Sequence, residues 1–327
     1  MNLQPGPDSA AAWVESPLQL LNAVEYAHQA PRSQPLTVLW RQRVRQLNTT
    51  AAWIADRAAG IVTVRPAQHA WHRQFLAART RIVGDAFSGQ YRLAISALGT
   101  RREVLLDDGS AALHLAASLS ATGQFERLGQ HESWPMRALG EITARRLRRA
   151  ATRGRLTWFT AYATDPLLAT VPHARIVPNE YTWLRAQHAP SPDGLGTTII
   201  LGSALAIDGY LDPMAYEEWV RSLGPEATYL PHRRESAAFL ARLAGAGLRV
   251  HQPALPAEIT VGLADRVNSV HSLPSSTSAT LRWILGSTRL TVHPVPDAWW
   301  TAAASPALRS TLAHISSTSA PPGEKEN

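Results

Sequence analysis

Short apolar runs alternate with segments of helical periodicity along the first half of the chain. Residues 17–28 carry apolar side chains at the three- and four-residue spacing of a core-facing helical stripe, at Leu20, Leu21, Val24 and Ala27. Strands are predicted at residues 11–14, 36–40, 60–64, 91–97, 104–106 and 156–161, the last of these ending the first sheet. Helices are predicted at residues 17–28, 42–59 and 71–86, and from residue 110 onward. This alternation is typical of an α/β fold with a parallel sheet.

The same alternation restarts in the second half. Strands are predicted at residues 198–201, 228–230, 248–251, 267–270 and 290–293, and helices at 235–243 and 277–285. The repeated rhythm predicts two Rossmann-like domains that face each other across a cleft. We place them at residues 1–172 and 173–315, the second ending in a closing helix within 297–316 that crosses back to the first domain. Residues 316–327 lack apolar periodicity and are predicted to be a disordered tail.

The composition excludes several classes of protein. The chain has 327 residues, 45% hydrophobic and 17% charged, so it can bury a large core and is not disordered, collagen-like or coiled-coil. It has no cysteine, which excludes disulfides, thiolate metal sites and a cysteine nucleophile. The histidines show no metal-ligand spacing, and no metal is expected. Apolar runs fall short of the ~20 residues of a membrane-spanning helix and the N-terminus lacks signal-peptide features, so we expect a soluble, cytoplasmic protein.

Arginine carries nearly all of the positive charge. The formal net charge is +7, and Lys325 is the single lysine. Most arginines are scattered and no helix-turn-helix, zinc-finger or RNA-binding signature appears, so no nucleic-acid partner is expected. One dense cluster consists of Arg145, Arg146, Arg148, Arg149, Arg153 and Arg155. This cluster is either a solvated helix face or a surface that binds anionic glycans or anionic lipid headgroups.

A pair of carboxylates follows the predicted strand at residues 104–106. Asp107 and Asp108 stand at the strand end, Gly109 permits a sharp turn, and Ser110 can cap the next helix. Ligands of parallel sheets bind beyond the carboxyl ends of the strands, so an aspartate at this place can accept a proton from an incoming hydroxyl. The alternative is an ordinary Asp-Gly turn.

A histidine follows a second predicted strand, at residues 228–230. Pro231 fixes the exit from the strand, and His232 then lies beside a predicted helix start with Arg233 and Arg234 next to it. Helix N-termini attract phosphate, and a protonated histidine can donate to a departing phosphate oxygen. The alternative is a surface histidine at a basic helix start.

Hydroxyl groups mark a third strand end, and a glycine marks a fourth. His271 ends one predicted strand, and Ser275, Ser276 and Thr277 begin the helix that follows. These hydroxyls either cap the helix or, together with its backbone amides, cradle a phosphate. Gly202-Ser203 follows the strand at 198–201, where glycine allows a nucleotide to approach the backbone closely.

Four segments of the chain resemble one family. Residues 15–23, ESPLQLLNA, resemble the N-terminal opening of the bacterial sialyltransferases that make capsule polysialic acid and sialylated lipooligosaccharide. Asp107-Asp108-Gly109 is similar to their acidic-acidic-glycine motif, residues 229–235 (YLPHRRE) to their histidine motif, and Ser275-Ser276 to their paired serines. The order matches from residue 15 to about residue 281. In the family, proline usually follows the histidine, whereas here Arg233 follows His232 and Pro231 precedes it.

The resemblance implies a GT-B fold and an inverting transfer of sialic acid from CMP-sialic acid to a hydroxyl of a cell-surface glycan, without a metal. Asp107 or Asp108 would deprotonate the acceptor in the first, acceptor-side domain. His232 would protonate or stabilise the departing phosphate in the second, nucleotide-sugar-binding domain. The residues implied to hold the nucleotide there are Gly202, Ser203, Pro231, His232, His271, Ser275, Ser276 and Thr277.

The arginine-rich segment fits the same resemblance. Arg145, Arg146, Arg148 and Arg149 would offer a surface to an acidic acceptor or bring the protein into peripheral contact with the anionic inner face of the cell membrane. Three alternatives remain open. In the first the donor would be another CMP-activated acidic sugar, and in the second it would be another nucleotide sugar. In the third the chain would be a non-catalytic relative that binds glycans or nucleic acid.

Overall fold

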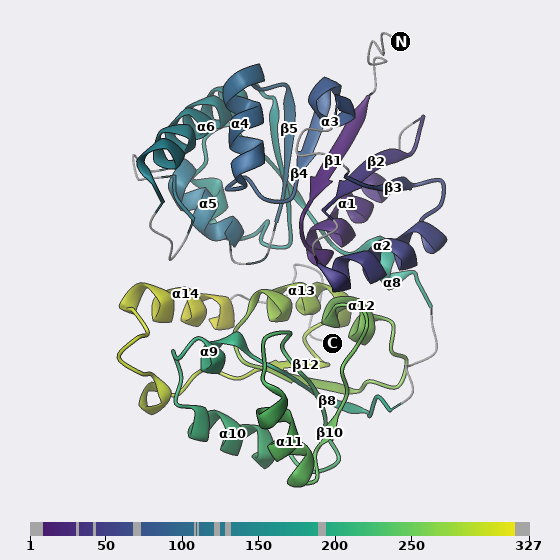
Figure 1. The fold of residues 1–327 in the computed structure, drawn as a ribbon, viewed down its shortest axis with the longest axis vertical. Helices are drawn as coiled ribbons and strands as arrows, with labels where there is room; N and C mark the ends of the chain where they lie inside the picture. The colour runs from purple at the N-terminus through teal and green to yellow at the C-terminus, as the bar shows by residue number, and fades with distance from the viewer. Residues whose placement is uncertain are drawn as a thin grey trace. The chain divides into compact units, whose positions relative to one another are not determined.

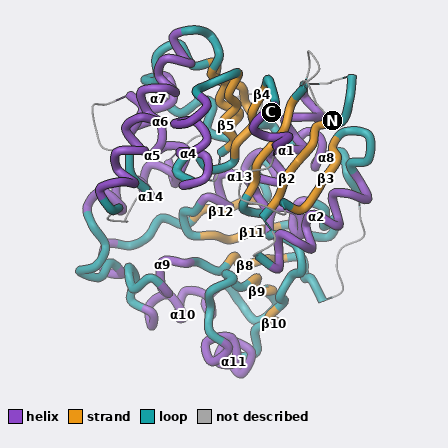
Figure 2. Tube along the Cα trace, turned by 45° about the horizontal axis from the view of Figure 1, so that its top comes forward, coloured by secondary structure: helices purple, strands orange, loops and turns teal. Residues whose placement is uncertain are grey.

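The polypeptide folds into two α/β units (Figure 1). The computed structural model describes residues 9–30, 33–41, 44–67, 73–107, 109, 111–120, 125–127, 132–188 and 194–317. The first unit comprises Met1–Trp183 and the second Leu184–Asn327. This division falls after the predicted boundary at residue 172, because β7 (Arg175–Pro178) pairs with β6 (Leu156–Thr160) of the first sheet. In each unit the strands run side by side as one layer (Figure 2).

The first unit is built on a seven-stranded parallel sheet with the strand order β3-β2-β1-β4-β5-β6-β7. Its other strands are β1 (Ala10–Val14), β2 (Leu36–Trp40), β3 (Val62–Pro66), β4 (Thr80–Val83) and β5 (Arg102–Leu106). Every residue of β1 after Ala10 is buried, as expected for a parallel strand covered on both faces. The chain moves outward from β1 to β3 and then returns to β4, so the direction of travel through the sheet reverses between β1 and β4.

Two groups of helices cover this first sheet. The helices of this unit are α1 (Pro17–Gln29), α2 (Arg45–Arg57), α3 (Arg73–Ala77), α4 (Gly89–Leu98), α5 (Ala111–Ser120), α6 (Trp134–Thr152) and α7 (Pro166–Ala169), and the short α8 (Thr182–Arg185) contains the boundary between the two units. Because β–α–β connections are right-handed, the reversal between β1 and β4 places α1 and α2 on one face and α4, α5 and α6 on the other (Figure 1). The N-cap of α1 is Ser16, whose Oγ accepts a hydrogen bond from the Gln19 N–H at 3.2 Å.

Three predictions for the first unit are wrong. Residues 73–86 of the helix predicted over 71–86 form α3 and then β4, while residues 71 and 72 lie outside the described residues. The predicted strand at 91–97 lies within α4, which buries Tyr91, Ala94 and Ile95 and leaves Leu93 44% exposed. The alternating apolar residues of this segment therefore do not lie on one face. The predicted last strand, at 156–161, is followed in the sheet by β7.

The second unit is built on a five-stranded parallel sheet with the order β10-β9-β8-β11-β12. Its strands are β8 (Thr198–Leu201), β9 (Thr228–Leu230), β10 (Arg249–Val250), β11 (Ser269–Ser272) and β12 (Leu290–Val292). Its helices are α9 (Ala204–Ile207), α10 (Pro213–Ser222), α11 (Ala237–Gly245), α12 (Ala257–Gly262), α13 (Ser276–Leu285) and α14 (Pro306–Ser317), with a 3-10 turn at Asp297–Trp299. The strand predictions for β8 and β9 agree with the structure residue by residue.

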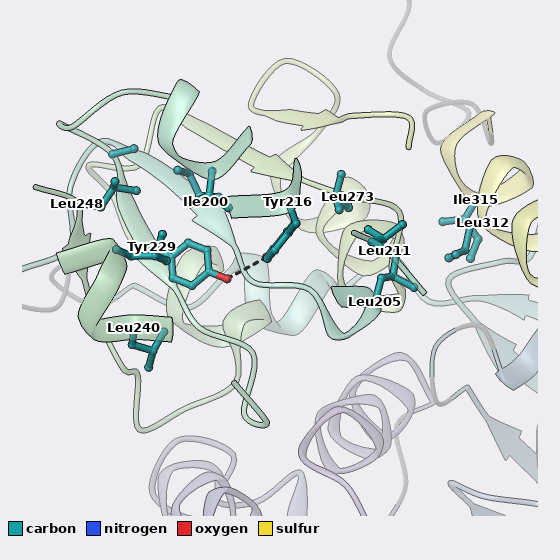
Figure 3. Close-up of a cluster of buried hydrophobic side chains, with 13 residues drawn as sticks. Ile200, Leu205, Leu211, Tyr216, Tyr229, Leu240, Leu248, Leu273, Leu312 and Ile315 are labelled. Atoms are coloured by element: carbon teal, nitrogen blue, oxygen red, sulfur yellow. Dashed lines mark hydrogen bonds between the residues drawn. The ribbon is translucent and has the colours of Figure 1, made fainter. Parts of the chain in front are cut away.

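A buried cluster of apolar side chains forms the core of the second unit (Figure 3). Ile200 of β8 and Tyr229 of β9 contribute from the sheet, and Leu312 and Ile315 contribute from α14. The last described helix is thus packed into this core. The predicted tail lies outside the described residues from residue 318 onward, whereas residues 316 and 317 end α14. Among the residues that the structure describes, no helix has both the length and the apolar character needed to cross a membrane.

Candidate functional site

Asp107 lies immediately beyond β5, at the carboxyl edge of the first sheet, and is 2% exposed. Its Oδ1 accepts a hydrogen bond from Asn22 Nδ2 at 2.5 Å. Its Oδ2 accepts hydrogen bonds from Thr160 Oγ1 at 2.9 Å and from the Ala161 N–H at 2.7 Å. Because Thr160 and Ala161 stand at the end of the neighbouring strand β6, the side chain of Asp107 ties two adjacent strand ends together. Both oxygens of this carboxylate are therefore engaged within the protein.

Asn22 is the hub of a wholly buried polar network around Asp107. It lies on α1, within the opening segment ESPLQLLNA, and is 0% exposed. Its Nδ2 donates to the Asp107 carbonyl oxygen at 3.0 Å as well as to the carboxylate. Its Oδ1 accepts from Asn179 Nδ2 and from the Tyr181 hydroxyl, both at 2.9 Å. One amide thus connects the acidic turn to the segment that follows β7.

The remainder of the predicted acidic turn is described only at Gly109. Asp108 and Ser110 lie outside the described residues. Gly109 has a φ of +71°, in the left-handed region that favours glycine, and its carbonyl oxygen accepts a hydrogen bond from the Ala112 N–H at 3.0 Å. The chain therefore turns sharply from β5 into α5 immediately after the two aspartates.

The second site surrounds the turn after β9. Glu235 Oε2 accepts a hydrogen bond from the His232 N–H at 2.9 Å, which closes the turn on itself. The backbone of Gly202, at the end of β8, packs so closely here that a Cβ atom would lie 2.4 Å from His232 N. Only glycine permits that approach. Gly202 and His232 are thereby brought together at the carboxyl edge of the second sheet.

A chain of hydrogen-bonded hydroxyl groups connects this turn to the segment after β8. The Tyr229 hydroxyl donates to Glu235 Oε1 at 2.5 Å, and it lies 2.9 Å from the Tyr216 hydroxyl, as the dashed line in Figure 3 marks. The Tyr216 hydroxyl accepts a hydrogen bond from the Ser203 N–H at 2.9 Å. The structure thus joins the segments after β8 and β9 through groups that sequence reasoning did not select. The signal was present for Tyr229 and Glu235, which begin and end the YLPHRRE motif.

The imidazole of His232 has one nitrogen engaged within the protein. The Arg234 N–H donates to His232 Nδ1 at 3.4 Å, so in the neutral ring the proton resides on Nε2. Burial lowers the pKa of His232 below its usual value, and the positive charges of Arg234 and Arg233 lower it further. In the ligand-free protein His232 is therefore a neutral donor through Nε2 at pH 7. A phosphate at Nε2 would raise the pKa of the ring again, because an opposite charge favours the imidazolium form.

Glu235 has the opposite tendency. Burial raises the pKa of Glu235 to about 7, and the hydrogen bonds that it accepts from Tyr229 and from the His232 backbone only partly offset that effect. Around neutral pH this carboxyl group is therefore present in both charged and neutral forms. The turn after β9 thus contains a carboxyl group that titrates close to neutral pH beside a histidine whose pKa is lowered.

The two arginines of the motif have different surroundings. Arg234 forms a two-point ion pair with Asp208, at 2.5 Å and 2.8 Å, and so anchors the turn to the end of α9. Arg233 forms no ion pair with any residue that the structure describes. Of the two guanidinium groups beside His232, that of Arg233 is the one not committed to a carboxylate.

The hydroxyl-rich junction after β11 lies at the same edge of the sheet. Ser275 is the N-cap of α13, and its Oγ accepts a hydrogen bond from the Ser278 N–H at 3.1 Å in a reciprocal capping box. Ser276 and Thr277 form the first turn of α13. His271 Nδ1 lies 3.0 Å from His293 Nε2, and burial lowers the pKa of both rings. One of the predicted hydroxyls, Ser275, is therefore already used to cap the helix.

The predicted nucleotide-binding residues converge on neighbouring strands. The order β9-β8-β11 places the carboxyl ends of these three parallel strands side by side. Those ends carry Gly202, Ser203, Pro231, His232, His271, Ser275, Ser276 and Thr277. The pairings were not apparent from the chain order, since β9 and β11 are separated by β10 in sequence and by β8 in space. The sheet topology therefore forms one polar edge from segments that are distant in sequence.

The four arginines proposed as one anion-binding surface do not face one way. Arg145 pairs with Glu141 at 3.2 Å on the exposed side of α6. Arg148 donates to the Leu119 and Ser118 carbonyl oxygens at the end of α5, at 2.7 and 2.9 Å. Arg146 and Arg149 instead line a separate cavity of the first unit. A helix spreads neighbouring residues around its circumference, so a dense run of arginines cannot present a single face.

The two units share one kind of fold. Each unit is an α/β layer structure on a parallel sheet, and the predicted α/β fold of the GT-B type is confirmed. No protein-family model matches the chain, and no curated protein matches it.

Solved structures of similar fold include the α/β-galactoside α-2,3-sialyltransferase of the luminous marine bacterium Photobacterium phosphoreum. Its TM-score is 0.51 at 10% identity, over 94% of this chain and 95% of that one. At this identity the likeness concerns the fold alone. UGT89C1 of Arabidopsis thaliana, complexed with UDP-L-rhamnose, has a TM-score of 0.43 at 10% identity, over 95% and 90% of the two chains. A ugt transferase of Siraitia grosvenorii, in complex with UDP, has a TM-score of 0.41 at 10% identity, over 88% and 82%.

Proposed function

We propose that the protein is an inverting glycosyltransferase that moves sialic acid from CMP-sialic acid to a hydroxyl of a cell-surface glycan. The observation that carries the proposal is the hydrogen bond of 2.5 Å between Asn22 and Asp107. It joins the opening segment to the acidic turn, two of the motifs that resemble the bacterial sialyltransferases. These motifs are 85 residues apart in sequence, and their contact supports a shared role at one strand end.

The two aspartates have different roles in this proposal. Asp107 is buried with both carboxylate oxygens engaged, so it positions the turn. Asp108 is then the general base that accepts the proton of the acceptor hydroxyl. As this O–H bond breaks, the acceptor oxygen forms a bond to the anomeric carbon, and the bond from that carbon to the phosphate oxygen of CMP breaks. Attack opposite to the departing phosphate inverts the configuration.

His232 is the general acid in the proposed reaction. Its Nε2–H donates to the phosphate oxygen as negative charge builds up there, and from the imidazolium form of the ring the proton can pass to that oxygen when CMP departs, which leaves a neutral imidazole. The lowered pKa of His232 suits this role, because an imidazolium with a lowered pKa is a stronger acid, and the negative phosphate beside it allows the ring to take up that proton from solvent. Arg233 supplies positive charge beside it. CMP carries a single phosphate, so these groups and helix amides can neutralise it, and we propose that no metal is required.

The nucleotide is held in this proposal at the carboxyl edge of the second sheet. Gly202 and Ser203 approach from β8, Pro231 and His232 from β9, and the first turn of α13 offers backbone N–H groups toward an anion. His271, Ser275, Ser276 and Thr277 complete this set. We also propose that the protein acts in the cytoplasm.

A thermal-shift titration without metal tests the donor. CMP, CDP, UMP, UDP, GDP and AMP are compared, since a ligand at 100 times its Kd stabilises a protein by about 2.7 kcal/mol. We expect selective stabilisation by CMP that is lost in His232→Ala and retained in His28→Ala, which removes an exposed histidine at the end of α1. Preference for another nucleotide would replace the donor, and no response to any nucleotide would favour a non-catalytic relative.

Transfer itself is then measured with CMP-sialic acid and a panel of oligosaccharide acceptors. Asp108→Asn should abolish turnover, because a neutral amide cannot accept the proton of the acceptor hydroxyl, and the free energy of unfolding is measured for the same variant. Asp107→Asn should lower both, because one of its oxygens becomes an NH₂ group among donors. The reverse pattern, with stability lost only in Asp108→Asn, would exchange the two roles.

A further inference from the structure

A cavity lined by arginines lies in the first unit and has no part in the proposed reaction. Its volume is about 500 Å³. We call it the arginine pocket and define it by its lining residues, Ala97, Leu98, Gly99, Thr100, Arg146, Arg149, Arg153 and Arg155. The pocket is formed by the last turn of α4, the last turns of α6 and the residue that precedes β6. Figure 1 shows α4 and α6 side by side on one face of the sheet.

The pocket lies at the amino edge of the first sheet. Arg155 immediately precedes β6, and its carbonyl oxygen accepts a hydrogen bond from the Glu103 N–H at 2.9 Å near the start of β5. Asp107 and Thr160 stand at the other ends of these two strands. A parallel strand rises about 3.3 Å per residue, so the five-residue strand β6 separates the two edges by roughly 16 Å. The arginine pocket is therefore remote from the acidic turn of its own sheet.

The positive charge of the pocket is not compensated by the protein. Among the residues that the structure describes, no carboxylate pairs with Arg146, Arg149, Arg153 or Arg155. The neighbouring arginines differ: Arg145 pairs with Glu141, and Arg81 with Glu103. Arg146 donates to the Ile95 carbonyl oxygen in the last turn of α4, and the buried Nε of Arg155 has no hydrogen-bond partner among the described residues. Four like charges around one cavity repel each other unless an anion lies between them.

The chemistry of the lining selects the kind of anion. We propose that the arginine pocket binds a phosphate group. Guanidinium groups match phosphate oxygens with paired N–H donors, and several can share one phosphate. The lining contains no aromatic ring and no carboxylate or amide side chain that could accept hydrogen bonds from sugar hydroxyls. The arginines could therefore pair with the carboxylate of an acidic sugar, but the lining offers few groups that could stack on its ring or accept hydrogen bonds from its hydroxyls.

Apolar side chains beside the pocket indicate a source for this phosphate. Leu98 lines the pocket and is 54% exposed. Ile142, which is 36% exposed, begins a stripe on α6 that continues through Arg146, Arg149 and Arg153 at spacings of four, three and four residues. Exposed apolar groups next to a basic pocket fit the headgroup region of an anionic phospholipid. The second source is a soluble phosphate ester, and the experiment distinguishes the two.

Vesicle binding forms the first arm of the test. The full chain is sedimented with phosphatidylcholine vesicles that contain or lack phosphatidylglycerol. Each arginine near an anionic surface contributes about 1 kcal/mol, so Arg149→Gln/Arg153→Gln should weaken binding to the anionic vesicles about 30-fold. The matched control, Arg57→Gln/Arg145→Gln, removes the same charge from two exposed ion pairs outside the pocket and should bind much more like wild type. Equal losses in the two double variants would show attraction by net charge and overturn the pocket.

Free phosphate forms the second arm. Inorganic phosphate and pyrophosphate are titrated against the thermal unfolding of wild type and the two double variants, whose unfolding without ligand is measured first as a check on folding. If the protein does not bind vesicles, pyrophosphate should stabilise wild type and the control but not Arg149→Gln/Arg153→Gln. That result would support the arginine pocket as a site for a soluble phosphate ester. A sialic-acid oligosaccharide is titrated in the same way. The proposal would be overturned if this oligosaccharide raised the unfolding temperature while phosphate, pyrophosphate and vesicles had no effect. Absence of all three responses would overturn it as well.

Discussion

The two strand-end sites hold their acidic side chains in different ways. In the first unit Asp107 is 2% exposed, and amide, hydroxyl and backbone donors engage both of its oxygens. In the second unit Glu235 is only partly buried, with a pKa raised to about 7 by burial, and its neighbour His232 has a pKa lowered chiefly by burial. The first arrangement fixes the position of a carboxylate, whereas the second contains a carboxyl group that changes charge near neutral pH. Buried polar networks and titratable turns can therefore occupy equivalent strand ends and have different uses.

The largest expected effect separates catalysis from stability in the second unit. His232→Gln should lower the transfer rate by about 10²–10⁴-fold, the usual contribution of a general acid, because the substituted amide cannot protonate a departing phosphate. The free energy of unfolding should stay within about 0.5 kcal/mol of wild type, since the turn is closed through the backbone N–H and not through the ring. Steady-state kinetics and urea unfolding measure the two quantities, with His28→Gln as the control. Unchanged turnover would remove His232 from the mechanism.

The next effect concerns the first unit, where we expect a substitution to lower stability. Asn22→Ala should lower the free energy of unfolding by about 3 kcal/mol, because it leaves a buried carboxylate, an amide and a tyrosine hydroxyl without their common partner. Urea unfolding of Asn48→Ala, which removes an exposed asparagine of α2, provides the control and should show little change. If Asn22→Ala were as stable as its control, the network would not hold the acidic turn.

The third effect is a pH dependence that arises from the turn after β9. The pKa of Glu235 is raised in the folded state from 4.5 to about 7, so its contribution to stability is fully present below about pH 4.5 and is lost as the pH rises through about 7. After allowance for partial exposure, this amounts to about 2 kcal/mol. His232 acts in the opposite direction: its lowered pKa means that stability increases as the pH rises toward 6.5.

Unfolding by urea at a series of pH values separates these two contributions. Glu235→Gln should flatten the decline in stability between about pH 4.5 and 7, and His232→Gln should make that decline steeper below pH 6.5. A pH profile that neither variant changes would contradict the view that the turn after β9 contributes to the pH dependence of stability.

The smallest expected effect concerns the hydroxyl chain beneath the histidine turn. Tyr216→Phe removes the acceptor for the buried Ser203 N–H and should cost about 1 kcal/mol of unfolding free energy. Because Ser203 belongs to the proposed nucleotide site, the affinity for CMP should fall in the same variant. Tyr210→Phe, at a partly exposed tyrosine, is the control for both measurements. A normal CMP affinity together with the expected loss of stability would show that Ser203 does not contact the nucleotide.

The pattern of the chain predicted strand ends more reliably than it predicted which segments are strands. Residues 104–106 and 228–230 lie in β5 and β9, so Asp107 and His232 were correctly placed at the carboxyl edges of two sheets. The segment at 91–97 was misassigned because its apolar residues satisfy both a two-residue and a helical spacing. Packing against α6 resolved that ambiguity, since Tyr91 and Ile95 face the interior while Leu93 does not.

The partners of the site residues were beyond the reach of sequence reasoning. Asn22 and Asp107 are distant in the chain, and their contact depends on α1 and β5 packing together. Glu235 was visible as the last residue of a quoted motif, yet its bond to the His232 backbone and its raised pKa arise from the closed turn and its burial. Resemblance identified the segments, whereas their roles depend on contacts between them.

The sequence by itself determined the α/β class, the two halves with separate parallel sheets and the strand ends where polar residues gather, because these depend on local periodicity and turn chemistry. Only the tertiary structure decided that Asn22 holds Asp107, that Glu235 closes the histidine turn and that Arg146 and Arg149 line a pocket while Arg145 and Arg148 do not. The physical reason is that a hydrogen bond or a buried charge depends on distances between segments, and those distances are set by how helices and strands pack rather than by their order along the chain.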